Sequence, residues 1–148
     1  MRSKGLTRMS NNLIGVSGVY ASALAHRVLP ALQRRTNEAF SSLKAEEQCR
    51  TLSSISIIAY APGNGAQFGT ESVSKPRYKR KSNEISVDIV LPEEDCDKDA
   101  LERLFIDLVG KALEVAINKA TSLNELIDPE KFRDKCSAAL KEIRETLT

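Results

Sequence analysis

The stretch from Glu84 to Ala120 limits what this chain can fold into more than any other part of it. Apolar residues alternate with other residues through its first positions, which read Ile85, Ser86, Val87, Asp88, Ile89, Val90 and Leu91. A period of two predicts a β-strand with one buried face. Pro92 ends this run, and a pattern with helical period follows soon after it. We therefore expect the rest of the chain to pack around this strand and helix.

Five carboxylates fill the elbow between the predicted strand and the predicted helix: Glu93, Glu94, Asp95, Asp97 and Asp99. Asp99, with Glu102 three residues later, has the spacing of a capping box and predicts the start of the helix. The apolar residues of the helix form two stripes, one of Leu101, Leu104, Phe105, Leu108, Ala112 and Ala116, the other of Ile106, Val109, Leu113, Ile117 and Ala120. A helix that is apolar over so much of its circumference is covered on two sides, here by a sheet and a neighbouring helix.

The residues before this stretch predict a helix and then a small sheet. Residues 1–10 are polar and basic and are expected to form a flexible tail. From Asn12 to Gln48 apolar residues recur at helical spacing. Pro30 interrupts this pattern, so either one helix kinks there or two helices meet near Leu29.

The first quarter of the chain is strongly basic. Residues 1–37 contain six basic residues and no acidic one, which gives this segment a charge of +6 and leaves the remainder at −4. Ala23-Leu24-Ala25 is similar to a signal-peptidase site, and a targeting segment would have this charge pattern. The apolar region before it is diluted by polar residues and glycines, which favours a core helix with a basic outer face.

A three-stranded antiparallel meander is expected between the two helical regions. Ser53 to Ala61 alternates in the manner of a strand, and the turn residues that follow are Pro62-Gly63-Asn64-Gly65. Thr70 to Arg80 predicts a second strand, which Pro76 breaks or confines to an edge. Ser82-Asn83 then turns the chain into the strand described first.

The C-terminal region predicts a second long helix. Asp128 followed by Pro129 supplies an N-cap and a proline at the first helical position. An apolar stripe continues from there to about Thr146. The order of helix, sheet, helix and helix predicts an α+β fold, with the two last helices packed on the sheet and residues 1–148 forming one domain.

Composition narrows the function classes. The chain is 41% hydrophobic and 28% charged, and it has no apolar run that approaches the roughly 18–20 residues of a spanning helix, so no membrane association is expected. Its three cysteines lack any CxxC spacing, which argues against disulfides and zinc and favours a reducing, cytoplasmic location. With His26 as the one histidine, we expect neither a metal site, nor a cofactor, nor an enzyme.

Two other sets of residues are of types that occur in binding or catalytic sites. The densest basic run comprises Lys75, Arg77, Tyr78, Lys79, Arg80 and Lys81. Basic residues with an interleaved aromatic bind nucleic acid, although positive charge also protects an edge strand from aggregation. In a strand, Tyr78 would face away from Arg77 and Lys79. A metal-dependent nuclease site uses carboxylates on strands with a nearby lysine, and Glu84, Asp88 and Lys81 are residues of these types. Their spacing, however, is not the usual one for such a site.

The alternating strand Ile85–Leu91, the acidic elbow and the helix Leu101–Ala120 together resemble small immunity proteins of bacterial contact-dependent or polymorphic toxin systems. The resemblance extends from Glu84 to Lys119 and includes no signature motif. It implies a cytoplasmic, non-enzymatic protein that binds a toxin domain and blocks its active site or its access to substrate. No functional residue carries over, and the basic N-terminal quarter is not accounted for.

The sequence thus leaves three functions, in order of preference. The first is a protein-binding module that neutralises a toxin, with the acidic elbow residues Glu93, Glu94, Asp95 and Asp97 facing a basic partner surface. The second is a nucleic-acid binder that uses the basic run from Lys75 to Lys81. The third is a metal-dependent nuclease. The oligomeric state stays open.

Overall fold

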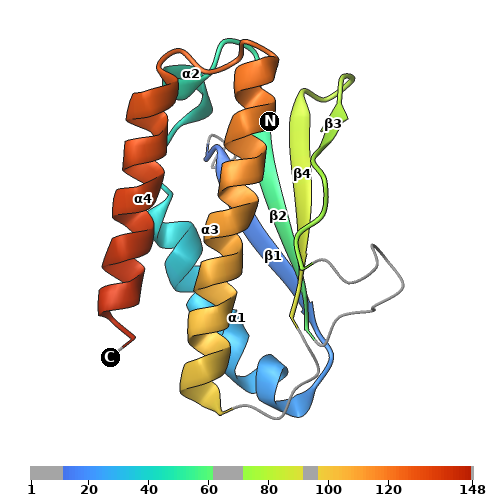
Figure 1. Ribbon diagram of the computed structural model, residues 1–148, viewed down its shortest axis with the longest axis vertical. Helices are drawn as coiled ribbons and strands as arrows, with labels where there is room; N and C mark the ends of the chain where they lie inside the picture. Colours follow the sequence, from blue (N-terminus) through green and yellow to red (C-terminus); the bar gives the residue numbers. More distant parts are fainter. Residues whose placement is uncertain (1–11, 62–71, 92–96, 148) are drawn as a thin grey trace, which may run out of the picture.

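The computed structural model describes residues 12–61, 72–91 and 97–147. Its elements are β1 (Ile14–Tyr20), α1 (Ala23–Ala39), α2 (Ala45–Gln48), β2 (Ser54–Ala61), β3 (Arg77–Lys79), β4 (Glu84–Val90), α3 (Lys98–Ser122) and α4 (Pro129–Glu145). Figure 1 shows the strands side by side in one sheet, with the long helices gathered on one side of it. The described part therefore confirms the α+β class, with one four-stranded sheet. The expected basic tail, residues 1–10, lies outside the described residues.

The strands are not arranged as the expected meander. Their order across the sheet is β1-β2-β4-β3, and both β1 and β4 run parallel to β2. Only β3 is antiparallel to its neighbour β4. The meander prediction is wrong in its order, because β4 lies between β2 and β3 and runs parallel to β2. Its last step is confirmed, since β3 and β4 are antiparallel on either side of the turn at Ser82-Asn83. The chain returns along the outer edge of β4, where Val90 donates its N–H to the carbonyl of Ser72, and then turns back into β4.

Pro76 limits the edge strand, as the sequence indicated. Val73 lies opposite Ile89 and Arg77 lies opposite Ser86, so four steps along the edge match three steps along β4. The edge segment therefore contains one extra residue, which is the definition of a β-bulge. Proline fits such a position because it has no N–H to give to the sheet.

The N-terminal region holds the largest error of the sequence reading. The predicted helix from Asn12 is in fact strand β1 followed by α1, which begins at Ala23. Ser22 forms the N-cap, with its hydroxyl accepting from the backbone N–H of Ala25 at 3.1 Å. One helix continues through Pro30 to Ala39, so two helices do not meet near that residue.

The outer edge of β1 is closed by a side chain from α1. Asn37 accepts a hydrogen bond from the N–H of Val16 at 2.8 Å and donates one to its carbonyl at 2.9 Å. The amide thereby imitates a neighbouring strand at this position. An edge strand normally presents unpaired backbone groups to other chains, and Asn37 removes one such pair from β1.

Gly18 makes room for the ring of Tyr20, which lies on the same face of β1. A Cβ atom added at Gly18 would overlap that ring, whereas one added at Gly15, on the opposite face, would meet nothing within 4 Å. The Tyr20 hydroxyl donates to Oε1 of Gln33 at 2.6 Å and so joins β1 to α1. Burial raises the pKa of Tyr20, so this hydroxyl stays protonated.

Helix α3 is covered on two sides, as its two apolar stripes predicted. It packs against β4 and β2 on one side and against α1 and α4 on the other. Asp128 and Pro129 start α4 as expected, and the Asp128 carboxylate accepts from the N–H of Lys131 at 3.1 Å. Helix α4 packs mainly on α1 and α3 rather than on the sheet. Among the described residues, no helix combines the length and the apolar character needed to cross a bilayer.

A locked loop follows α3. Asn124 adopts a left-handed conformation (φ 56°). The N–H of Glu125 donates to the carbonyl of Ala120, and the N–H of Asn124 donates to the carbonyl of Thr121. This pair of hydrogen bonds is a Schellman motif. The buried Glu125 carboxylate then accepts from the N–H groups of Thr51 and Leu52, both at 2.7 Å, and from the Thr51 hydroxyl. Burial by itself would raise the pKa of Glu125, but these hydrogen bonds hold it below its usual range.

We expect Gly18→Ala to destabilise the protein by about 1–3 kcal/mol, because the new methyl group displaces the Tyr20 ring and breaks its hydrogen bond to Gln33. Gly15→Ala is the matched control and should change the free energy of unfolding by less than about 0.5 kcal/mol. Urea denaturation of both variants measures the difference, and equal effects would show that Tyr20 is not held over Gly18.

We expect Glu125→Gln to cost about 1–3 kcal/mol at pH 7, since an amide cannot accept all the hydrogen bonds of the carboxylate. The folded pKa lies below the unfolded one, so the contribution of Glu125 is complete above the unfolded pKa of about 4.3 and is lost as the pH falls through the folded pKa. The stability difference between wild type and variant should therefore shrink below about pH 4. Urea titrations at several pH values test this, with the exposed Glu142→Gln as control; a difference that is constant with pH would contradict it.

Candidate functional site

The face of the sheet opposite the helices, here called the outer face, is the main surface that the fold leaves uncovered within the described residues. Along β2 the odd-numbered residues are buried under the helices, whereas the even-numbered ones are partly exposed. Strands β1 and β4 are in register with β2, so their residues alternate in step with it. The outer face comprises Gly15, Ser17, Val19, Ser54, Ser56, Ile58, Tyr60, Arg77, Lys79, Glu84, Ser86, Asp88 and Val90.

Register divides the outer face into transverse rows of different character. At the C-terminal ends of the parallel strands, Val19, Tyr60 and Val90 lie side by side. Val19 is 57% exposed. Nearer the other end, Gly15 and Ser56 lie beside Ser86, so this row consists of small residues and ends at Arg77. The outer face thus combines an apolar corner, a shallow polar row and a cationic edge.

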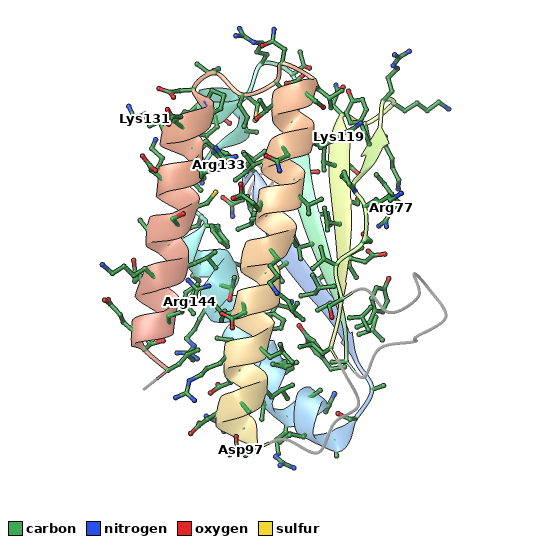
Figure 2. All side chains as sticks on the ribbon, in the orientation of Figure 1. Arg77, Asp97, Lys119, Lys131, Arg133 and Arg144 are labelled. Atoms are coloured by element: carbon green, nitrogen blue, oxygen red, sulfur yellow. The ribbon has the colours of Figure 1, made fainter. Side chains whose placement is uncertain are left out.

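An ion pair holds the cationic edge in place. The two terminal nitrogens of Arg77 donate to the two carboxylate oxygens of Asp88, both at 2.9 Å. The hydrogen bonds to Asp88 raise the pKa of Arg77 against the opposing effect of burial, and the charge of Asp88 and the nearby Tyr60 add to this. The Arg77 side chain is 48% exposed and that of Asp88 is 13% exposed, so the guanidinium is accessible and fixed in orientation. Figure 2 shows Arg77 beside the edge strand, on the opposite side of the molecule from Lys131 and Arg144 of α4.

The rest of the predicted basic run falls partly on this surface. Lys79 joins Arg77 on the outer face, while Lys75, Arg80 and Lys81 are exposed in the segments that flank β3. Tyr78 pairs with the buried Ile85, so it faces the core, and its hydroxyl donates to the Asn83 side chain at 3.1 Å. The prediction that Tyr78 would face away from Arg77 and Lys79 is confirmed. Tyr78 is therefore not placed to stack on a nucleobase.

Most of the acidic elbow lies outside the described residues, namely Glu93, Glu94 and Asp95. Asp97 is described and forms the N-cap of α3, where its carboxylate accepts from the N–H of Ala100 at 2.8 Å. The N-cap therefore lies two residues before the predicted cap at Asp99. The other half of the predicted box is also wrong, because Glu102 is buried and paired elsewhere. A carboxylate at an N-cap also interacts favourably with the helix dipole, so Asp97 stabilises the start of α3.

The fold brings together only some of the residues of the predicted nuclease site. Glu84 and Asp88 do share the outer face, as their spacing predicted. Asp88, however, is held by Arg77, and Lys81 lies in the turn before β4. Within the part of the chain that the structure describes, no three carboxylate, histidine or cysteine side chains are grouped so as to hold a metal ion.

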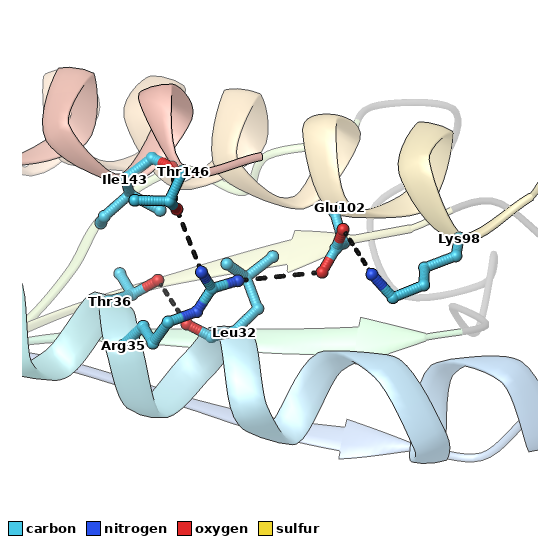
Figure 3. A network of polar contacts seen from close by, with 7 residues as sticks. All are labelled: Leu32, Arg35, Thr36, Lys98, Glu102, Ile143 and Thr146. Carbon is cyan, nitrogen blue, oxygen red and sulfur yellow. Dashed lines mark hydrogen bonds and ion pairs between the residues drawn. The ribbon is translucent and has the colours of Figure 1, made fainter. Parts of the chain in front are cut away.

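Sequence reasoning missed a polar cluster that ties the helices together (Figure 3). The buried Glu102 is 3.3 Å from Lys98 and 3.9 Å from Arg35, and Arg35 also donates to the hydroxyl of Thr146 at 3.0 Å. The cluster thus joins α1, α3 and the end of α4. The four-residue spacing of Lys98 and Glu102 is a sequence signal that could have revealed their ion pair. The partner from α1 had no signal in the sequence.

The helix layer offers an alternative surface to the outer face. A groove of about 440 Å³ runs between α3 and α4 beside Gly110 and Leu140. Ion pairs bridge its rims, from Arg144 to Asp107 at 3.4 Å and from Arg133 to Glu114 at 3.0 Å. Because these charges already satisfy one another across the two helices, the groove has little left with which to recognise a ligand.

Comparisons of the chain with models of protein families, with curated proteins and with solved structures each gave no match. The functional argument therefore depends on the residues and geometry of the chain itself.

Proposed function

We propose that the protein is a non-catalytic binding module that recognises another protein through the outer face of its sheet. One observation supports this above all: a sheet of mainly parallel strands has helices on only one side within the described residues. All-parallel sheets occur almost only with both faces covered, because their crossover helices lie on both sides. The outer face of this mainly parallel sheet has no such helix among the described residues, and it still carries Val19, Ile58, Tyr60 and Val90. A partner protein would supply the second cover.

The composition of the outer face fits a protein interface. Val19 is exposed, and Ile58, Tyr60 and Val90 are half-buried on the same side of the sheet. Interfaces typically combine an apolar, aromatic centre with a charged rim. Here the rim is the edge with Arg77 and Lys79, so the apolar corner would provide affinity and the charged edge would fix orientation.

The resemblance to immunity proteins favours a toxin domain as the partner and a cytoplasmic setting. Blocking a toxin requires a large, rigid surface rather than a reactive group, and an ordered sheet provides such a surface. The role proposed for the acidic elbow stays a prediction, since Asp97 serves as a cap and the other three residues are not described. We therefore propose the outer face, rather than the acidic elbow, as the surface that binds the partner.

Site-specific photo-crosslinking tests this proposal. We expect a benzophenone amino acid at Ile58 to give one discrete protein adduct in cells, whereas the same group at the exposed Ala138 of α4 gives none. With the captured protein purified, Ile58→Asp should weaken its binding at least about tenfold, which corresponds to about 1.4 kcal/mol. Ala138→Asp is the matched control and should leave the dissociation constant unchanged. Adducts from both positions, or from Ala138 alone, would refute the outer face as the interface.

Nucleic-acid binding is the second candidate, because five cations from Lys75 to Lys81 are exposed near one edge. The inward position of Tyr78 and the carboxylates of Glu84 and Asp88 on the outer face count against it. Under the proposal of a protein partner, we expect a single-stranded oligonucleotide to bind only weakly and without preference for the outer face. Neutralising Lys79, Arg80 and Lys81 together should then change the affinity for the oligonucleotide little. Tight binding whose affinity falls with salt by a slope of about −0.7 per neutralised phosphate would reverse the order of the two candidates.

A further inference from the structure

We infer that the outer face receives an acidic segment of its partner, with one carboxylate bound by Arg77 beside Ser86. This inference rests on the proposed function and adds the chemistry of the partner. It depends on three observations of different kinds: a buried hydroxyl that bonds to no described residue, a guanidinium fixed by Asp88 with N–H donors to spare, and an excess of positive charge among the described residues of this edge.

The hydroxyl of Ser86 is the first observation. Ser86 is only 7% exposed, yet its side chain makes no hydrogen bond to any described residue. Ser74 provides the contrast: it is equally buried, and its hydroxyl accepts from the N–H of Asp88 at 2.9 Å and donates to the carbonyl of Lys75 at 3.0 Å. Buried hydroxyl groups are normally satisfied, and an exception calls for an explanation. A polar group of a docked partner would provide the missing acceptor.

Arg77 is the second observation, and it lies directly across from Ser86 in the antiparallel pair. Side chains so paired have Cβ atoms about 4.5–5.5 Å apart, so one ligand group can reach both. A guanidinium has five N–H donors, and the two hydrogen bonds to Asp88 leave three of them available. Since Asp88 fixes the orientation of the group, its free donors point in a defined direction. Planar donor pairs of this kind match the geometry of a carboxylate.

The net charge of this edge is the third observation. Among the described residues of this edge, five are cations (Lys75, Arg77, Lys79, Arg80 and Lys81) and two on the neighbouring strand are carboxylates (Glu84 and Asp88), which gives these seven a net charge of +3. A partner with acidic side chains complements this balance. Acidic side chains can also be spaced to avoid Glu84 and Asp88, whereas the continuous charge of a phosphate backbone would pass close to them. The small side chains of Gly15 and Ser56 let a partner segment approach the row closely.

A defined acidic probe tests the inference without the natural partner. We expect a hexaglutamate peptide, titrated into the isotopically labelled protein, to shift the amide resonances around Ser56, Arg77 and Ser86. Arg77→Gln should weaken this binding by about tenfold, as the loss of a charge-assisted pair implies. Ser86→Val should weaken it by about threefold while leaving the urea midpoint unchanged or raised, because it removes an unsatisfied hydroxyl. Lys135→Gln on α4 is the control and should bind as the wild type does.

Asp88→Asn gives the sharpest result, since a binding role and a purely structural role of the ion pair predict different affinities for the peptide. If the ion pair of Arg77 and Asp88 served stability alone, the variant would bind the peptide no better than the wild type does. The amide oxygen of the new asparagine can still accept a hydrogen bond from Arg77 and so keep it oriented, while the competing negative charge is gone. If Arg77 binds an incoming carboxylate, this variant should therefore bind the peptide about threefold or more tightly than the wild type does. Weaker binding by Asp88→Asn would overturn the inference, as would equal losses for Lys135→Gln and Arg77→Gln.

Two further outcomes separate this inference from the proposed function. A crosslinked partner at Ile58 together with peptide binding that ignores Arg77 and Ser86 would keep the interface and overturn its acidic chemistry. An oligothymidine that produces the same amide shifts as the peptide, but at lower concentration, would overturn it in favour of a nucleic-acid ligand.

Discussion

The burial of one side of strand β2 is the constraint on which the rest of the structure depends. Its odd-numbered residues, from Ile55 to Ala61, lie fully within the core, and β1 and β4 are aligned with it residue by residue. Ile55 and Ile57 therefore have apolar neighbours on both sides, which are Ile14 and Ile85 for Ile55, and Val16 and Val87 for Ile57. A shift of one residue in either strand would turn its buried side chains outward. The same alternation assigns the outer face its polar and half-exposed residues, so core and candidate site are two consequences of one register.

Local signals in the sequence sufficed for the elements that stand alone. The strand ending at Leu91 and the helix after it were predicted because their periods differ clearly, and Asp128-Pro129 marked the start of α4 through its capping chemistry. Strand β1 was missed because Val16, Tyr20 and Leu24 are spaced four apart, which imitates a helix across a strand, a turn and the first residues of α1. Gly15 and Gly18 were the opposing signal, because glycine has a low helix propensity.

Non-local pairing explains the remaining errors. The direction in which β4 runs beside β2 depends on the path of the chain between them, and a turn motif such as Pro62-Gly63 carries no information on whether that path closes a hairpin or crosses an edge. The contact between Arg77 and Asp88 likewise arises from a bulge and a turn acting together. A list of charged residues identified the basic run, but only the fold shows which of its members are fixed, which face the core and which remain free.

Asn37 has a consequence for how the chain is made. Its amide reaches Val16 from 21 positions further along the chain, so the edge of β1 stays open until α1 has formed. During synthesis the strand emerges first, and in that interval its backbone can pair with another nascent chain. Helix α1 is complete before any residue of β2 is made, so the edge at Val16 can be covered first, while the opposite edge of β1 stays unpaired until β2 follows.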